Sequence, residues 1–167
     1  MNNIWFISDT HFYHNNIIKY CNRPFTTVEE MNETIISNWN TVVKQNDVVW
    51  HLGDFCFGSK EYTPEIVKRL NGRIRLVKGN HDARTNNFYR ESGFIEVYDY
   101  PVVVHTFMVL SHEPMPFIPP TMLNLYGHVH DSTMYETWGN MCACMCVERH
   151  NYTPVSLEEV KQHYVKE

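Results

Sequence analysis

The stretch IWFISDTH, residues 4–11, decides the fold, because a short apolar run ends at Asp9 and a histidine follows two positions later. An apolar run of this length, bounded by polar residues, is typical of a strand buried in a parallel sheet. Ligands collect at the carboxyl edge of such sheets. Residues 4–8 are therefore predicted to form a strand that delivers Asp9 and His11 to that edge.

The same arrangement recurs twice in the first half of the chain. Residues 47–52 (DVVWHL) and 73–77 (RIRLV) are predicted strands, again followed directly by polar residues. The first ends before Gly53-Asp54, and the second runs into Gly79-Asn80-His81-Asp82. Three strands of this kind indicate a parallel sheet with polar side chains gathered along one edge.

Two helices are predicted between these strands. Apolar residues recur at helical spacing over 28–43 and over 61–70. Thr27, with Glu30 three residues later, has the form of a capping box at the start of the first helix. The order strand, helix, strand, helix, strand indicates an α/β fold.

The second half of the chain is rich in strand-like runs and has little helical sequence between them. Four prolines within 114–120 predict a rigid loop between two of these runs. Residues 156–165 close the chain as a predicted helix, with Ser156 and Glu159 in capping-box positions. Two sheets packed face to face, with helices outside, are expected. The strand-like runs are FIEVYDY (94–100), VVVHTFMVLSH (102–112), LNLYGHVH (123–130) and MCACMCV (141–147).

The chain has 167 residues, of which 43% are hydrophobic and 20% charged, ordinary values for a globular protein. This length is typical of one compact domain, so residues 1–167 are predicted to be a single domain. The 14 basic against 19 acidic residues give a formal net charge of −5. A negative charge argues against broad, charge-driven DNA binding, but not against a nucleotide substrate.

Neither the hydrophobic pattern nor the cysteines indicate a membrane or secreted protein. No stretch approaches the ~20 consecutive apolar residues that span a bilayer, and the opening MNNIWFISDTHF lacks the features of a signal peptide. The five cysteines are an odd number, and Cys142, Cys144 and Cys146 are too close to pair with one another. Reduced thiols, a cytoplasmic location and no membrane partner are expected.

Five places in the sequence combine the end of an apolar run with side chains able to bind metal. They supply carboxylates, an amide and imidazoles without thiolate, which suits Mn, Fe, Zn, Co or Ni better than Ca or Mg. The positions are too many for one ion, whereas two ions ~3.5–4 Å apart that share a carboxylate would use them. The five places are Asp9-Thr10-His11, Gly53-Asp54, Gly79-Asn80-His81-Asp82, His112 and Gly127-His128-Val129-His130.

This ordered set, D-x-H, GD, GNHD, a lone His and GHVH, resembles the calcineurin-like metallophosphoesterase superfamily over roughly residues 4–130. The stretches ISDTHFYHNNIIKYCNRPF and YTPVSLEEV are similar to those of short bacterial or phage-type members. The resemblance implies a four-layer αββα sandwich of two mixed β-sheets flanked by helices.

The resemblance also implies a role for each motif. It implies a first metal on Asp9, His11 and His130. It implies a second metal on Asn80, His112 and His128, with Asp54 bridging both. His81 would act on the substrate phosphate and the leaving group rather than on a metal.

The function expected from this site is that of a dinuclear metal-dependent phosphoesterase. Two cations sharing a water lower its pKa, so that a metal-bridging hydroxide attacks phosphorus. The expected substrate is a small phosphate monoester or diester, a nucleotide-derived ester being one candidate, and manganese is the favoured metal. The alternative is a non-catalytic metal-binding interaction scaffold on the same fold. A homodimer is compatible with the sequence.

Departures from the superfamily's motifs narrow the range of expected substrates. Phosphoprotein phosphatases of this superfamily carry GDxxDRG, whereas this chain has GDFCFGS at 53–59, without the second aspartate or the arginine. A phosphoprotein phosphatase is therefore disfavoured. Residues 131–167 leave little room for the DNA-binding or cap elements of the family's nucleases.

Several other residues have competing interpretations. Asp82 could orient the ring of His81, His51 could support a ligand, and His14 could touch substrate. A core or solvated role is favoured for His14 and His51, as for His105, His150 and His163. For Cys142, Cys144 and Cys146, burial as small apolar groups is favoured over a zinc site. For Arg23, Arg84 and Arg149, a solvated surface charge is slightly favoured over a contact with phosphate.

Overall fold

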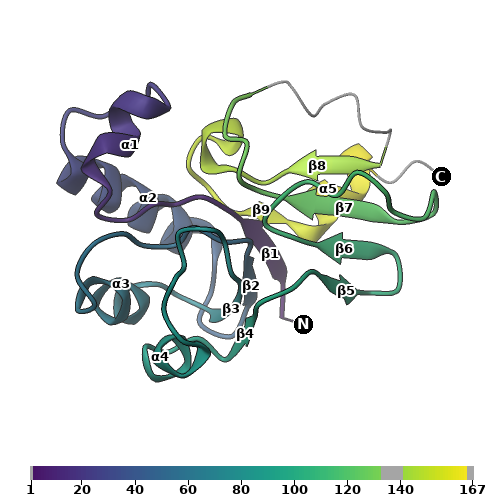
Figure 1. Ribbon diagram of the computed structural model, residues 1–167, viewed down its shortest axis with the longest axis horizontal. Coiled ribbons are helices and arrows are strands. Elements are labelled where there is room, and N and C mark those ends of the chain that lie inside the picture. The colour runs from purple at the N-terminus through teal and green to yellow at the C-terminus, as the bar shows by residue number, and fades with distance from the viewer. Residues whose placement is uncertain (1, 133–140, 165–167) are drawn as a thin grey trace.

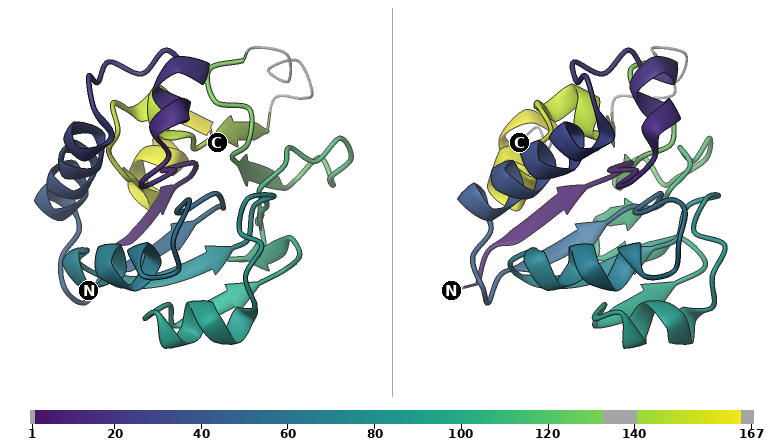
Figure 2. Two further views of the ribbon diagram at one scale, coloured as in Figure 1. Left: turned by 60° about the vertical axis from the view of Figure 1, so that its left-hand side comes forward. Right: turned by 90° about the vertical axis from the view of Figure 1, so that its left-hand side faces the viewer.

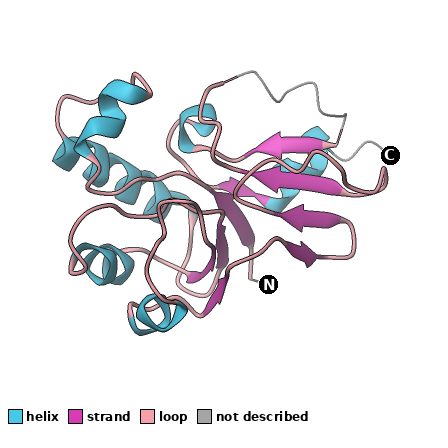
Figure 3. Ribbon diagram, viewed as in Figure 1, coloured by secondary structure: helices cyan, strands magenta, loops and turns pink. Residues whose placement is uncertain are grey.

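The computed structural model describes residues 2–132 and 141–164, which form two mixed sheets with flanking helices (Figures 1 and 3). The predicted α/β class is therefore confirmed. In the described part of the chain, no helix has the length and apolar character that crossing a membrane requires.

The first sheet contains the strands predicted from the first half of the sequence. Its order is β4-β3-β2-β1-β9, in which the first four strands are mutually parallel and β9 is antiparallel to β1. The carboxyl ends of the parallel strands consequently meet at one edge. The strands are β1 (Ile4–Ile7), β2 (Val48–His51), β3 (Arg73–Val77), β4 (Glu96–Tyr98) and β9 (Val155–Ser156).

The second sheet has the order β5-β6-β7-β8. The predicted run 102–112 divides into an antiparallel hairpin, because His105 and Thr106 adopt positive φ angles of 51° and 61° between β5 and β6. The proline-rich loop lies between β6 and β7, as predicted, and β6, β7 and β8 are parallel. The strands are β5 (Val102–Val104), β6 (Met108–Leu110), β7 (Leu123–Tyr126) and β8 (Cys142–Cys144).

Both predicted capping boxes mark the start of a helix. Thr27 Oγ1 accepts from the backbone N–H of Glu30 at the start of α2, but the Glu30 carboxylate accepts from Thr26 N rather than from Thr27 N. Ser156 and Glu159 exchange both bonds at the start of α5. The helices are α1 (Asn15–Tyr20), α2 (Val28–Val42), α3 (Tyr62–Arg69), α4 (Asn86–Glu91) and α5 (Leu157–Tyr164), with a 3-10 helix at Val147–His150. Neither α1 nor α4 was predicted, because each spans fewer than two turns.

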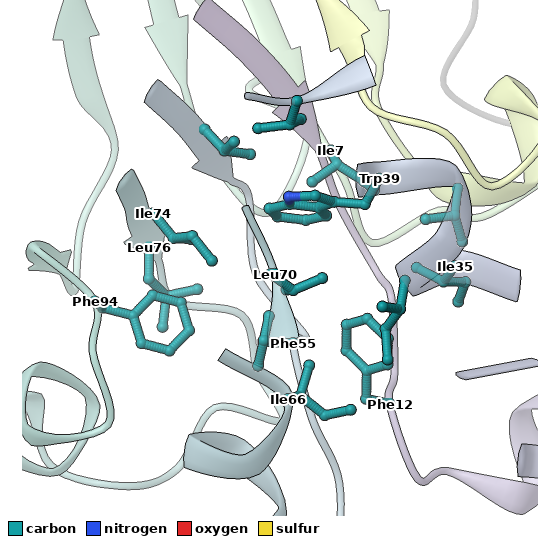
Figure 4. Packing of buried hydrophobic residues seen from close by; sticks show 14 of the residues in the cluster. Ile7, Phe12, Ile35, Trp39, Phe55, Ile66, Leu70, Ile74, Leu76 and Phe94 are labelled. Carbon is teal, nitrogen blue, oxygen red and sulfur yellow. The ribbon is translucent and has the colours of Figure 1, made fainter. Parts of the chain in front are cut away.

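In the part of the chain that the structure describes, two large hydrophobic clusters hold the layers together. In one, α2, α3 and α4 cover a face of the first sheet, with Trp39 packed near Ile7 and Ile66 near Phe55 (Figures 2 and 4). The other core fills the space between the sheets and includes Phe6, Trp50, Leu52, Val77, Met108, Leu110, Leu123, Leu125 and Met145. Burial of these side chains is the main force that aligns the two sheets.

The two sheets are joined at the carboxyl end of β1. Ser8 N donates to Met145 O at 2.9 Å, and Val147 N donates to Ser8 O at 3.1 Å. Ser8 pairs with Cys146 as an isolated parallel bridge. This bridge fixes the residue before Asp9 against the second sheet, so the polar edges of both sheets face one place.

Candidate metal centre

The structure brings the seven predicted ligand side chains together at the carboxyl edges of the two sheets. Asp9 and His11 follow β1, Asp54 follows β2 and Asn80 follows β3. From the second sheet, His112 follows β6, and His128 and His130 follow β7.

The first predicted group surrounds one oxygen of Asp9. Asp9 Oδ1 lies 3.8 Å from His11 Nε2 and 3.8 Å from His130 Nε2. The other carboxylate oxygen, Oδ2, accepts from His128 N at 2.8 Å and from Cys146 Sγ at 3.3 Å. The backbone and thiol contacts hold the carboxylate so that Oδ1 faces the two imidazoles.

In the second predicted group, the donor atoms lie closer together than in the first. Asn80 Oδ1 lies 2.9 Å from His112 Nε2 and 3.0 Å from His128 Nδ1, and these two nitrogens are 3.2 Å apart. Three donor atoms at such spacing form one face of the coordination shell that a transition-metal ion with N and O ligands about 2 Å away would need.

Asp54 lies between the two groups. Its Oδ2 is 3.5 Å from His11 Nε2 in the first group and 3.5 Å from His112 Nε2 in the second. Its Oδ1 accepts from the backbone N–H of His81 at 2.8 Å. A single carboxylate oxygen therefore faces imidazole nitrogens from both groups.

Two buried atoms test whether these residues fit a cation. Within residues 2–132 and 141–164, Asp9 Oδ1 and His11 Nε2 are buried and lack a hydrogen-bond partner. A buried polar atom without a partner costs about 1–3 kcal/mol, and more when it is charged. Burial would raise the pKa of the Asp9 carboxyl, but the neighbouring imidazoles outweigh burial and hold it far below its usual range. An ionised oxygen beside a free imidazole nitrogen fits a divalent cation.

The backbone around the centre is strained. Five of the seven predicted ligands have φ angles in the left-handed region, which costs of order 1 kcal/mol for a side chain other than glycine. Strain of this kind persists only where the surrounding structure enforces it, and it clusters at functional sites. The five are Asp9 (57°), His11 (49°), Asp54 (56°), His128 (71°) and His130 (50°).

Positive φ angles at His128 and His130 also turn these two side chains toward different ligand groups. In a strand, residues i and i+2 point to the same face, but β7 ends at Tyr126, before His128 and His130. His128 reaches Asn80 in the second group, and His130 reaches Asp9 in the first.

Two glycines allow the backbone to approach ligand side chains more closely than any other residue could. A Cβ on Gly79 would overlap Asp54 Oδ1 and lie 2.6 Å from Asp54 N. A Cβ on Gly127 would overlap Ser8 Oγ and Asp9 Oδ2. The close approach that these glycines permit brings the two sheet edges to the distances given above.

Hydrogen bonds fix which ring nitrogen of His112 and of His130 faces the centre. His112 Nδ1 donates to the carbonyl oxygen of Leu52 at 2.9 Å, which turns Nε2 toward Asn80. His130 Nδ1 lies 2.9 Å from Glu148 Oε1, and its Nε2 faces Asp9 Oδ1. Metal-binding histidines commonly hold their second ring nitrogen in this way.

The structure adds a buried ion pair that the sequence did not reveal. Arg23 Nη2 lies 2.7 Å from Glu148 Oε1, and the same guanidinium donates to the backbone oxygens of Asp9 and Thr10. The slightly favoured interpretation of Arg23 as a surface charge is wrong, because its side chain is fully buried by these contacts. The carboxylate that pairs with its charge lies 125 positions away along the chain, and sequence spacing carries no signal for such a contact.

A third donor group lies behind His130. Cys21, His130 and Glu148 each offer a ligand atom within 4.8 Å of the others. Burial lowers the pKa of His130, but the contacts with Cys21 and Glu148 and the charge of Asp9 outweigh it and raise the pKa to about 11. Because the Arg23 guanidinium already neutralises Glu148, we interpret this group as support for His130 rather than as a further cation site.

His81 is exposed at the rim of the centre, with its ring centroid 5.5 Å from that of His11. The alternative that Asp82 orients this ring is not what the contacts show. The Asp82 carboxylate turns inward and accepts from the backbone N–H groups of Asp54, Phe55 and Gly79. Asp82 thus shapes the loop that carries Asp54.

Other residues singled out in the sequence have structural partners. His14 packs its ring on Phe57 at 4.2 Å and contacts His11, and burial lowers its pKa to about 4. His51 hydrogen-bonds with Thr10 and Gly53, and His150 with the Cys144 carbonyl. Cys144 and Cys146 are buried beside Tyr126 and Val129, as the apolar interpretation predicts, whereas Cys142 is only half-buried. Arg149 donates to His130 O, Arg84 is exposed, and His105 and His163 are exposed.

Comparison with known proteins agrees with this arrangement. The sequence profile of the calcineurin-like phosphoesterases matches residues 3–140. The uncharacterised protein MJ1445 of Methanocaldococcus jannaschii is 38% identical over 169 residues, covering 95% of this chain and 89% of that protein.

Solved structures also share the fold. A protein of unknown function from Aquifex aeolicus, AQ665, superposes with a TM-score of 0.77 at 29% identity, covering 97% of this chain and 99% of that one. The nuclease MPE of Pseudomonas putida superposes with a TM-score of 0.52 at 22% identity, covering 76% and 61% respectively. By its fold, its ordered motifs and the match over residues 3–140, the chain belongs to the calcineurin-like phosphoesterase family.

Proposed function

We propose that the chain is a dinuclear metal-dependent phosphoesterase. The observation that carries the proposal is the position of Asp54 Oδ2, 3.5 Å from an imidazole nitrogen of each ligand group. One shared carboxylate between two sets of N and O donors suits two neighbouring divalent cations.

Each cation would have its own ligands besides Asp54. Asp9, His11 and His130 would hold the first, and Asn80, His112 and His128 the second. The donors are oxygen and nitrogen, so Mn²⁺, Fe, Zn²⁺, Co²⁺ and Ni²⁺ are the candidates, with Mn²⁺ tested first. When bound, the cations would neutralise the phosphate oxygens and activate a water for in-line attack.

The chain's own contribution to the reaction centres on His81. Its ring is exposed beside the first ligand group, and its backbone N–H is held by Asp54 Oδ1 at 2.8 Å. A protonated imidazole there would donate a proton to the leaving oxygen of a phosphate ester. General acid catalysis of this kind contributes typically about 10²–10⁴-fold in rate.

The test is hydrolysis of p-nitrophenyl phosphate and bis-p-nitrophenyl phosphate by the metal-free protein after addition of Mn²⁺ or another candidate ion. We expect His81→Ala to lose about 10²-fold or more in kcat while still binding metal, and Asp54→Ala to lose both metal and activity. His105→Ala, in the exposed β5–β6 hairpin, is the matched control. Full activity of Asp54→Ala would overturn the proposal.

A non-catalytic scaffold is the second candidate. Metal binding with no turnover of either ester under any of the ions would favour it.

A further inference from the structure

Two clefts flank the candidate metal centre, one on each side of the loop 79–82. The first, of about 470 Å³, is lined by Asn80 and His112 of the second ligand group and extends over Tyr100 and Met115. The second, of about 450 Å³, is lined by His81 and extends over Phe57 and Arg84. Each volume lies within the range that binds a ring-sized organic group.

The loop itself separates the two clefts. Asn80 and His81 are consecutive residues, yet one lines the first cleft and the other lines the second. Asn80 Oδ1 points to the second ligand group, while the His81 ring lies near His11 of the first. A phosphate at the centre would therefore have one cleft on either side of it.

The first cleft offers aromatic and apolar side chains rather than excess positive charge. Tyr100 is 81% exposed at its edge, beside Pro101 and Met115. The ammonium group of Lys78 is paired with Asp99 at 3.0 Å. A ring stacked on an aromatic side chain gains about 1–3 kcal/mol, so this surface suits an uncharged ring better than a further phosphate.

The second cleft combines an aromatic ring with a cation. Phe57 is 40% exposed, and its ring is held parallel to His14, 15° from coplanar. The exposed Arg84 donates to Gly58 O at 3.1 Å and lies over the Phe88 ring at 5.1 Å, which fixes its guanidinium at the cleft. His81, the predicted proton donor, lines this cleft, so the leaving group belongs here.

We propose that the preferred substrate is a phosphodiester with a ring-sized group on each ester oxygen, the retained group in the first cleft and the leaving group in the second. This inference rests on the proposed phosphoesterase function. A nucleotide-derived diester has the required chemistry, because it carries a flat ring system on either side of one phosphate. A monoester would leave one cleft unused.

The reaction balances as a simple hydrolysis. The oxygen of water forms a bond to phosphorus, and the bond from phosphorus to the leaving oxygen breaks. That oxygen keeps the electron pair and takes the proton from His81, and a proton from the attacking water restores His81. The products are an alcohol and a phosphomonoester.

The test uses three esters with one leaving group: p-nitrophenyl phosphate, its methyl diester and its phenyl diester, each with Mn²⁺. Because the leaving group is the same in all three esters, differences in kcat/KM reflect how the first cleft binds the retained group. We expect kcat/KM to rise from the monoester to the methyl diester to the phenyl diester. One favourable ring contact of 1.4 kcal/mol is about a tenfold gain.

Variants of Tyr100 test whether the gain in kcat/KM comes from a contact in the first cleft. Tyr100→Ala should reduce the phenyl-to-methyl ratio toward the ratio of the uncatalysed reactions, and Tyr100→Phe, which keeps the ring, should restore it. Phe117→Ala is the matched control, because Phe117 is 89% exposed but does not line the cleft. It should keep the wild-type ratio.

The outcomes separate the two proposals. If none of the three esters is hydrolysed with any candidate ion, the proposed function fails. If esters are hydrolysed but the monoester is best, or Tyr100→Ala and Phe117→Ala give the same ratio, the diester inference is overturned while the proposed function stands.

Discussion

The Nδ1 atom of His130 lies 2.9 Å from the Oε1 atom of Glu148, and this contact connects the first ligand group to a buried ion pair. Glu148 is itself held by Arg23, whose guanidinium also binds the backbone carbonyl of Asp9. Two predicted ligands of one cation, Asp9 and His130, are therefore positioned by a single buried arginine–glutamate pair.

Replacing Glu148 by glutamine should weaken metal binding at the first ligand group. The amide keeps the shape but removes the charge that orients and polarises the His130 ring, and changes of this kind typically cost 10–100-fold in metal affinity. Competition against a chelating dye, with Mn²⁺ or Zn²⁺, measures the affinity directly. Glu158→Gln, on the exposed face of α5, is the control. Equal affinities in the two variants would show that Glu148 does not support the site.

Removing Arg23 should destabilise the metal-free protein. Arg23→Ala leaves Glu148 buried without its cation, which costs about 3–5 kcal/mol. Arg69→Ala breaks ion pairs with Glu33 and Glu65 that are partly or fully exposed, so about 1 kcal/mol or less is expected. Urea denaturation of the two variants measures the difference. A loss for Arg23→Ala no larger than that for Arg69→Ala would contradict the buried-pair interpretation.

Asp47 should make the stability of the protein depend on pH. Burial raises the pKa of its carboxyl, but hydrogen bonds from Lys44 N, Trp5 Nε1 and Asn3 N outweigh burial and hold the pKa below its usual range. Because the folded pKa is depressed, this stabilisation is present above pH ~4 and is lost as the pH falls through the folded pKa.

Asp47→Asn should therefore cost about 1–3 kcal/mol at pH 7, as expected for hydrogen bonds to a charged group. The difference from wild type should shrink below pH ~4. Urea denaturation at pH 7 and at pH 3 measures both values, with the exposed Glu29→Gln as control. A difference that stays constant across this range would mean that the Asp47 charge does not contribute.

Much of the fold could be predicted from the sequence, because the strands are short apolar runs that end at polar residues. β3 matches its predicted bounds, and α2 begins directly after its predicted capping residue, Thr27. The short helices α1 and α4 were missed, since six residues give too little periodicity to detect. The break of 102–112 into a hairpin depends on positive φ angles at His105 and Thr106, residue types that carry no strong turn signal.

In the candidate site, too, some residues could be predicted from the sequence and others could not. Side chains at strand ends, such as Asp54 and His112, were predictable because parallel strands deliver them to one edge. Arg23 and Glu148 were not, because their roles depend on a contact between distant segments. The inward turn of Asp82 likewise depends on the three backbone N–H groups that meet there, which adjacency to His81 does not reveal.

The central claim is that Asp54 is shared by two divalent cations. Metal content per chain, measured by elemental analysis after loading with Mn²⁺ and removal of unbound ion, tests it most directly when wild type is compared with Asp54→Asn. We predict two ions per wild-type chain and a loss at both ligand groups in the variant. One ion or none in the wild type, or two ions retained without the Asp54 carboxylate, would contradict the account.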